Sequence, residues 1–410
     1  MAACQEKIDQ YAKLTVKMGL NIQKGQILAI NSPLESAEFT RAVVREAYRL
    51  GAKRVHVDWS DSPTQRLQFE EQPEESLKEV PKWRVEMYDE LIENKGALLH
   101  ITGADPNAFA GVDPKRIQMV QQASGQSLKD FKIAQLKGDI HWCIVGVPTV
   151  AWAKLVFPDK APDQALDDLW EAIFKTVRLD HADPIAAWDQ HSKDLHDKMN
   201  YLNDQHFKAL HYKGPGTDLS IELHPDHLWV GAGHKSTQEH VFIPNMPTEE
   251  VFTAPLKTGV NGTVKNTKPL SVNGNLIENF SFTFKDGKVV NFSAEKGYEA
   301  LEGLLDTDES ARYLGEVALV PHQSPISQSG IIFMNTLYDE NASCHIALGT
   351  SFSMNVKNGS NMSEEELIDS GANQSFIHTD FMIGSGELDI DAETQDGKRI
   401  PLFRNGNWAI

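Results

Sequence analysis

The first third of the chain alternates short apolar runs with amphipathic segments, and this alternation constrains the fold more than any other feature of the sequence. Residues 26–30 (QILAI) and 54–59 (RVHVDW) have the composition of buried strands, and residues 35–50 between them have helical spacing and end at Gly51. Strands separated by helices pair in parallel, because a parallel pair needs a long crossover connection. The sequence therefore predicts an α/β N-terminal domain with a parallel sheet and helices on its faces.

The alternation of strands and helices continues along the first half of the chain. The expected elements are a helix over residues 83–94, strands over 97–102 and 142–147, and helices over 163–177 and 184–210. The last helix precedes Lys213-Gly214-Pro215-Gly216, a sequence that breaks helices. Because 410 residues are too many for one ordinary core, we place a boundary near the start of this helix and expect domains of residues 1–185 and 186–410.

After Gly216 the sequence changes to short alternating segments joined by turns. Asp286-Gly287 between two of these segments is a hairpin signal, and hairpins join antiparallel strands. Helical spacing is limited to residues 298–305 and 363–370. We therefore expect a mainly antiparallel, β-rich (α+β) C-terminal domain. Its expected strands cover residues 218–223, 227–230, 240–243, 280–284, 289–292, 315–320, 330–333, 345–348, 376–382 and 388–390.

Charge, cysteine content and missing motifs exclude several classes of protein. With 39 basic and 58 acidic residues the formal net charge is −19, which argues against a nucleic-acid backbone or an anionic membrane surface as a partner. No apolar run reaches the roughly 18 residues of a membrane span. Residues 31–36 (NSPLES), after the first strand, lack the glycines of a nucleotide-binding turn. Residues 1–20 have no apolar signal core, and three cysteines without a CxxC pair indicate a reducing compartment, so we expect a cytoplasmic protein.

A histidine and an aspartate lie two residues apart in the expected strand over residues 376–382. In a strand, residues i and i+2 face the same side, so His378 and Asp380 point together while Thr379 points away. One imidazole and one carboxylate on a common face could bind a divalent cation. The alternative is a simple His–Asp hydrogen bond, and the pair alone does not decide between the two.

Four further ionisable residues lie at strand ends or turns of the same half. Glu316 lies in an apolar segment, where a carboxylate is costly to bury unless it is paired or metal-bound. Glu340 lies in an expected turn, and His345 opens an apolar strand, where a structural role is the alternative. Glu250 follows a Pro-Thr-Glu sequence that could equally cap a helix.

Four segments of the second half together resemble the thermophilic-aminopeptidase family of metallopeptidases (M29 type). They are residues 247–255 (PTEEVFTAP), 315–318 (GEVA), 341–349 (NASCHIALG) and the pair His378-x-Asp380. The length and domain order of the chain also fit this family, although all the matching motifs lie in the C-terminal half. The resemblance implies a catalytic C-terminal domain in a dimeric exopeptidase that acts on peptides and binds two divalent cations, such as cobalt, zinc or magnesium.

The resemblance also implies roles for particular residues. The implied metal ligands are Glu250, Glu316, Glu340, His345, His378 and Asp380. Glu316 is the implied bridge between the two cations, and we count it as catalytic for that reason. Several members of the family carry a tyrosine seven residues after the ligand histidine, where this chain has Phe352. Either the hydroxyl is dispensable here or another donor replaces it.

The residue types agree with hydrolysis by two cations. Four carboxylates carry a charge that two divalent cations balance, and such cations can activate a water and polarise a peptide carbonyl. A general base must still carry the proton from that water to the leaving amine. We predict Glu249, next to Glu250, for this role. The alternative is that Glu249 faces solvent.

The sequence therefore predicts a metal-dependent aminopeptidase with broad, apolar-leaning specificity. Two alternatives stay open. A two-metal hydrolase of another bond, such as a phosphoester, could use the same cations, although no Arg- or Lys-rich segment adjoins the motifs to hold a phosphate. A non-catalytic relative could keep the fold and bind peptides without cleaving them.

Overall fold

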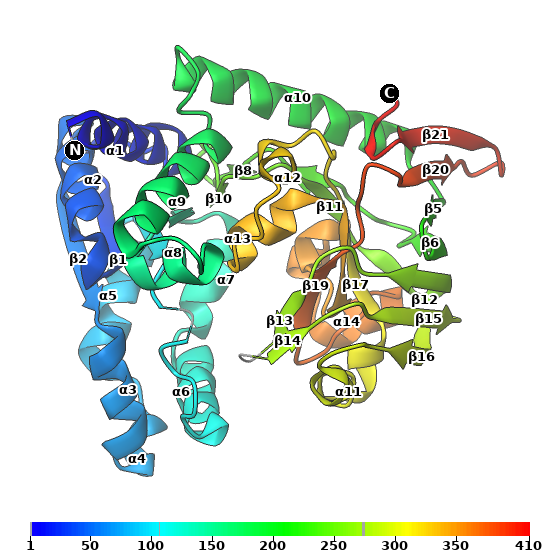
Figure 1. The fold of residues 1–410 in the computed structure, drawn as a ribbon, viewed down its shortest axis with the longest axis horizontal. Helices are drawn as coiled ribbons and strands as arrows, with labels where there is room; N and C mark the ends of the chain where they lie inside the picture. Colours follow the sequence, from blue (N-terminus) through cyan, green and yellow to red (C-terminus); the bar gives the residue numbers. More distant parts are fainter. Residues whose placement is uncertain (1, 106, 273–274) are drawn as a thin grey trace. The chain divides into compact units, whose positions relative to one another are not determined.

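Figure 1 shows the computed structural model of the chain, which describes residues 2–105, 107–272 and 275–410. The chain packs as two compact units. One is formed by Met1–Gln190 and Gly233–Pro247, the other by His191–Ala232 and Thr248–Ile410. The expected domains of residues 1–185 and 186–410 stay a prediction, because compact packing alone does not show that a part folds independently.

The first unit is built on a five-stranded parallel sheet with the strand order β10-β4-β3-β1-β2. Its strands are β1 (Ile27–Pro33), β2 (Arg54–Ser60), β3 (Ala97–Thr102), β4 (His141–Gly146) and β10 (Asn245–Met246). Each neighbouring pair is parallel, and β1 is buried along most of its length, as expected for a strand covered on both faces. The predicted parallel α/β fold is confirmed.

Amphipathic helices pack together in this unit. The helices are α1 (Ala2–Leu14), which continues into η1 (Thr15–Gly19), α2 (Ala37–Arg49), α3 (Ser62–Glu71), α4 (Glu74–Leu77), α5 (Lys82–Glu93), α6 (Pro114–Ser127), α7 (Lys129–Lys137), α8 (Val150–Val156) and α9 (Pro162–Thr176). On α2, the buried residues Phe39, Val43 and Ala47 are spaced four apart and share one face. Tyr11 of α1 meets Phe39 with ring centroids 5.0 Å apart, so an aromatic contact joins the two helices.

The long helix α10 (Pro184–Gln205) is shorter than predicted. The sequence predicted a helix to residue 210, but His206 has a φ of 45°, which ends the helix. The following residues form strand β5 (Ala209–Gly214), which pairs with β6 (Thr217–Leu223) across the predicted breaker. Pairing in a sheet therefore overrides the apolar spacing that favoured a longer helix.

The described residues of the second unit form two main antiparallel sheets and one small two-stranded sheet. The larger has the strand order β16-β15-β12-β6-β5-β20-β21-β22. Its further strands are β12 (Pro255–Lys265), β15 (Ser281–Lys285), β16 (Lys288–Ser293), β20 (Asp389–Glu393), β21 (Arg399–Arg404) and β22 (Asn407–Trp408). β15 and β16 pair across Asp286-Gly287, the predicted hairpin.

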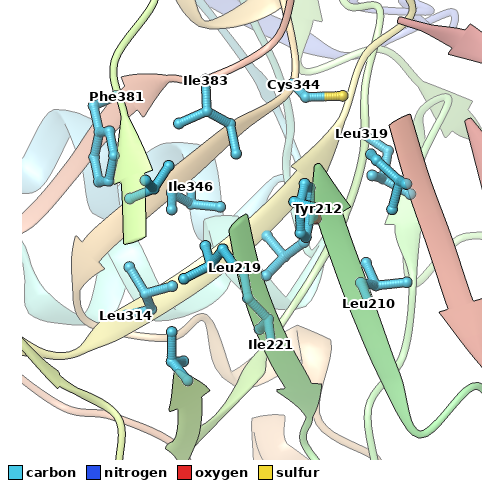
Figure 2. Packing of buried hydrophobic residues seen from close by; sticks show 14 of the residues in the cluster. Leu210, Tyr212, Leu219, Ile221, Leu314, Leu319, Cys344, Ile346, Phe381 and Ile383 are labelled. Atoms are coloured by element: carbon cyan, nitrogen blue, oxygen red, sulfur yellow. The ribbon is translucent and has the colours of Figure 1, made fainter. Parts of the chain in front are cut away.

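The smaller sheet has five strands in the order β19-β18-β17-β11-β7. They are β7 (Val230–Gly231), β11 (Val251–Thr253), β17 (Leu314–Leu319), β18 (His345–Gly349) and β19 (His378–Met382), all paired antiparallel. Figure 2 shows one face of this sheet packed through Leu314, Ile346 and Phe381 onto Leu219 and Ile221 of β6. Truncating a buried aliphatic residue such as Ile346 to alanine should cost about 2–5 kcal/mol of unfolding free energy. The packed face fixes which side chains point the other way.

The remaining elements of the chain are short. The hairpins β8 (His234–Lys235) with β9 (Val241–Phe242) and β13 (Leu270–Val272) with β14 (Asn275–Ile277) form small separate sheets. The short helices are α11 (Tyr298–Leu305), α12 (Pro325–Ser329), α13 (Thr336–Asp339) and α14 (Glu364–Ser370), with 3₁₀ turns η2 (Leu34–Ser36), η3 (Glu309–Arg312), η4 (Glu340–Ala342), η5 (Ser353–Asn355) and η6 (Gly359–Asn361). No helix among the described residues is long and apolar enough to cross a membrane.

The predicted strand over residues 330–333 is wrong. These residues form a loop, in which the backbone N–H of Phe333 donates to Asp339 Oδ1 at 2.8 Å. The Phe333 ring packs against Tyr338 with centroids 4.7 Å apart. The apolar run is therefore explained by an aromatic anchor of the loop rather than by a strand. The antiparallel, β-rich character predicted for the C-terminal part is confirmed.

Candidate metal centre

Alternation along the smaller sheet sends ionisable side chains to the face opposite the core. The residues of this sheet that pack into the core are Leu314, Val317, Leu319, Ile346, Leu348 and Phe381. The register of β17 shifts between Leu314 and Glu316, and from there on side chains alternate along the strands. Glu316 on β17, His345 on β18, and His378 and Asp380 on β19 therefore point to the other face. Glu250 directly precedes β11 of the same sheet.

The register of the sheet places two of these residues, Glu316 and Asp380, on either side of Ala347. Glu316 pairs with Ala347, and Ala347 pairs with Asp380. The methyl group of Ala347 on β18 fills little space, so the carboxylates of Glu316 on β17 and Asp380 on β19 can approach one another over it. The carboxylates of Glu316 and Asp380 therefore lie on one face of the sheet, close enough to share a cluster.

The structure brings five of the six predicted ligands together in two overlapping clusters. Glu250, Glu316 and His345 form one, and Glu316, His378 and Asp380 form the other. His345 Nε2 lies 3.1 Å from Glu250 Oε2 and 3.5 Å from Glu316 Oε1. His378 Nε2 lies 3.6 Å from Glu316 Oε2 and 3.5 Å from Asp380 Oδ1. The two oxygens of Glu316 therefore face different histidines.

Both histidines are oriented by backbone carbonyl groups. His345 Nδ1 lies 3.1 Å from Ser343 O, and His378 Nδ1 lies 2.8 Å from Thr350 O. A carbonyl oxygen only accepts, so each Nδ1 carries the hydrogen and donates it. In the neutral imidazole, Nε2 is then the lone-pair atom that faces the carboxylates, which is the arrangement found in metal-binding histidines.

The electrostatics of the centre show an excess of negative charge. Burial and the nearby charges of Glu250 and Asp380 raise the pKa of the Glu340 carboxyl well above its usual range. Burial and the charge of Asp380 also raise the pKa of Glu316, although His345 opposes this shift. Burial disfavours the charged form of His378, but the adjacent Asp380 outweighs it and raises the pKa of His378 to about 10. Raised carboxyl pKa values are expected where several buried carboxylates lie together without enough positive charge.

Several features fit a divalent cation at this place. Asp380 Oδ1 is buried and makes no hydrogen bond among the described residues, and its nearest basic neighbour, His378 Nε2, is 3.5 Å away. An unsatisfied buried carboxylate oxygen costs free energy unless a cation approaches it. The donor set of carboxylate oxygens and imidazole nitrogens suits zinc, cobalt or magnesium.

Glu340 lies on η4, outside the two clusters. Its carboxylate is close enough for Glu250, Asp380 and His345 to influence its pKa, but it does not share the tight grouping of the other five. Its role as a metal ligand stays a prediction, as do the roles of the other predicted site residues.

Glu249 does not face solvent. Its side chain is 3% exposed, and its backbone N–H donates to Asn341 Oδ1 at 2.8 Å. Glu249 Oε2 lies 3.6 Å from Nε2 of His191, a residue of α10 that also approaches Thr248 O at 2.7 Å. The solvent-facing alternative is therefore wrong, while a role in proton transfer stays a prediction.

Sequence reasoning missed His191 and did not foresee the place of Phe352. His191 gives no signal in the sequence, because a lone histidine on an amphipathic helix is an ordinary surface residue. Phe352 was noted only as a departure from the family pattern, but its ring contacts the His378 ring at a centroid distance of 4.6 Å. The apolar ring therefore forms one wall of the centre beside His378.

Comparisons with known proteins agree with this geometry. The family model described as thermophilic metalloprotease (M29) matches residues 4–408. Aminopeptidase 2 of Geobacillus stearothermophilus is 50% identical over 406 residues, which cover 99% of this chain and 98% of that protein. Aminopeptidase AmpS of Bacillus subtilis (strain 168) is 46% identical over 410 residues, the full length of both chains.

A solved structure shows the same fold. Wild-type AmpT from Thermus thermophilus superposes with a TM-score of 0.92 at 40% sequence identity, and the match covers 99% of each chain. Matches of this length and identity establish the family. The chain is therefore a member of the thermophilic metalloprotease family M29 and a metal-dependent aminopeptidase, as the motifs of its C-terminal half predicted.

Proposed function

We propose that this aminopeptidase uses two divalent cations, held by the two clusters that share Glu316. The observation that carries the proposal is the position of Glu316, whose Oε1 and Oε2 face His345 and His378 respectively. Bound cations would activate a water and polarise the peptide carbonyl. Cobalt and zinc suit the mixed imidazole and carboxylate set better than magnesium, which prefers oxygen ligands alone.

The side chains of the two clusters would hold these cations in place and balance their charge. Glu250 and His345 complete the first cluster, and His378 and Asp380 complete the second. Together with Glu316 and Glu340, their four carboxylates supply a formal charge of about −4, which matches two divalent cations. Glu340 would act as a further ligand or as a nearby charge.

We propose Glu249 as the group that takes a proton from the attacking water and returns it to the leaving amine. Its buried carboxylate is adjacent in sequence to Glu250 and is held near His191. The backbone of Glu249 is fixed by Asn341, which follows Glu340 on η4. A proton carrier in a fixed position loses less entropy in the transition state than a mobile one.

The proposed substrates are peptides with a free N-terminus and broad, apolar-leaning side-chain preference. A free α-amine is a good ligand for a divalent cation, which would explain why only the first residue is removed. We also propose a cytoplasmic homodimer. Cys143 and Cys344 are free and buried, as expected in a reducing compartment, and the dimer rests on the family resemblance.

Metal removal and restoration test the proposed function. Chelator-treated protein should release no leucine from a leucyl chromogenic amide, and cobalt or zinc should restore release with two bound cations per chain, counted by elemental analysis. The N-acetylated amide should stay uncleaved, because it lacks the α-amine. Release that does not depend on metal, or turnover of a phosphodiester in its place, would refute the proposal.

A further inference from the structure

One apolar side chain near the centre is unusually exposed. Phe376 is 91% exposed, whereas the next most exposed large apolar side chain among the described residues, Trp83, is 60% exposed. Scattered exposed apolar residues are common, so exposure alone indicates nothing. The position of Phe376 and the hydrogen bonds of its backbone indicate a function for the exposed ring.

The backbone at Phe376 is fixed by a network of hydrogen bonds centred on Asp308. Asp308 Oδ2 accepts from the Phe376 N–H at 2.8 Å and from Ser375 Oγ at 2.7 Å. Asp308 Oδ1 accepts from the backbone N–H groups of Ser310 and Ala311. A carboxylate with four donors holds the segment in place, so the exposed ring is presented by an ordered backbone.

The same segment is tied to the metal centre through Thr350. The Ser375 N–H donates to Thr350 Oγ1 at 2.9 Å, and the Thr350 N–H donates to Ile377 O at 2.8 Å. The Thr350 carbonyl accepts from His378 Nδ1 at 2.8 Å. One residue thus positions both the backbone beside Phe376 and the imidazole of a predicted ligand.

The direction of the chain places Phe376 at the rim of the centre. Ile377 and Phe381 pack toward the core, so His378 and Asp380 point to the opposite face. Phe376 lies at a bend just before β19, and its Cα is within about 7 Å of the His378 Cα because two peptide units span no more. A peptide substrate in extended conformation covers about the same distance in two residues.

We propose that Phe376 is a specificity residue that contacts an apolar side chain of the peptide substrate on the far side of the cleaved bond. This inference rests on the proposed aminopeptidase function. If the substrate amine binds at the proposed cations, the residues that follow it would extend away from the centre, where Phe376 would offer an aromatic surface. Phe352, whose ring contacts the His378 ring at a centroid distance of 4.6 Å, is a second apolar side chain beside this ligand.

The variant Phe376→Ala tests the proposal with three substrates of the metal-loaded enzyme. These are a leucyl chromogenic amide, the tetrapeptide Leu-Phe-Gly-Gly and the tetrapeptide Leu-Ser-Gly-Gly. The value of kcat/KM for the phenylalanine peptide should fall about tenfold, mainly through KM, because one aromatic contact is lost. The values of kcat/KM for the other two substrates should change by less than about twofold. The variant Phe376→Tyr keeps an aromatic ring, so its kcat/KM for the phenylalanine peptide should be close to that of the wild type.

Val290→Ala is the matched control, since Val290 is a 57% exposed apolar residue on β16, in the larger sheet. It should leave all three substrates unchanged. An equal loss with all substrates, or no loss with the phenylalanine peptide, would overturn the role of Phe376. If the wild-type enzyme cleaves none of them, the proposed function fails, and calorimetry with the two tetrapeptides decides the inference. The inference is supported if the wild type binds the phenylalanine peptide more tightly than the serine peptide and Phe376→Ala removes this difference. Equal binding of the two peptides by the wild type overturns it.

Discussion

The two clusters that share Glu316 differ in depth. The inner cluster, Glu250 with His345 and Glu316, has an imidazole that is 1% exposed and a Glu250 side chain that is 11% exposed. The outer cluster, His378 with Asp380 and Glu316, has side chains that are 23% and 14% exposed for His378 and Asp380. The two carboxylates are thus about equally exposed, whereas the imidazole of the outer cluster is much more accessible than that of the inner one.

The difference follows from the strand order of the sheet. β18, which carries His345, is flanked by β17 and β19, whereas β19, which carries His378 and Asp380, is the edge strand. A central strand buries its side chains between two neighbours, while an edge strand leaves one side open. If each cluster binds a cation as proposed, the inner one would hold it more firmly, and substrate and solvent would approach through the outer one.

Replacing the shared residue should have the largest effect. Glu316→Gln keeps the shape of the side chain but removes the charge that faces both histidines, so both cations should be lost or weakly bound. Activity should fall by about 10³-fold or more. Elemental analysis and leucyl amide turnover measure the two effects. Glu299→Gln, an exposed acid on α11, is the control, and normal activity in Glu316→Gln would contradict a shared ligand.

Single-cluster variants should separate the two halves. Asp380→Ala alters the outer cluster, so one tightly held cation per chain should remain in the inner cluster. Glu250→Ala alters the inner cluster, so the one remaining cation should be lost quickly on dialysis against a chelator. Each should lose about 10²-fold or more in activity, because the proposed mechanism uses both cations. If the two variants retain metal equally well, the inferred difference between the clusters is wrong.

The proposed proton carrier should affect turnover without affecting metal. Glu249→Gln removes a base but lies outside both clusters, so the protein should still bind two cations while kcat falls about 10²-fold. The pH dependence of kcat should change with it. Near-normal turnover by the metal-loaded variant would remove Glu249 from the mechanism.

The stability of the metal-free protein should depend on the outer histidine at high pH. The folded-state pKa of His378 is about 10, above its unfolded value of about 6.5, so its protonated form stabilises the fold. This contribution is complete below about pH 6.5 and is lost as the pH rises through about 10, at roughly 1.4 kcal/mol for each pKa unit. Denaturant unfolding of chelator-treated wild type and His378→Gln should show a smaller decline in the variant.

The smallest expected effect concerns the wall beside the outer cluster. Phe352→Tyr adds a hydroxyl to the ring that contacts His378, and a new donor near the substrate carbonyl should raise kcat by a few-fold, up to about tenfold. Metal content should not change. A fall in kcat would show that the apolar wall, rather than a missing donor, matters at this position.

The sequence predicted those parts of the centre that depend on local spacing. His378 and Asp380 share a face because a strand repeats every two residues, and the structure confirms that they do. The parallel sheet of the first unit also followed from local alternation of strands and helices. Period and composition act over a few residues, so a single sequence displays them directly.

Other parts depend on contacts between distant segments. The placement of Ala347 between Glu316 and Asp380 depends on strand register, which no single segment encodes. His191 reaches Glu249 from a helix far earlier in the chain, and β10 joins the parallel sheet from residues beyond position 240. Such contacts join residues that are far apart in the sequence, so local spacing does not reveal them.

Anomalous diffraction from crystals loaded with cobalt tests the central claim most directly. The account predicts two cobalt peaks per chain, one in the inner and one in the outer cluster, with Glu316 bound to both through its separate oxygens. A single peak, or two peaks of which one does not contact Glu316, would contradict the two-cation centre.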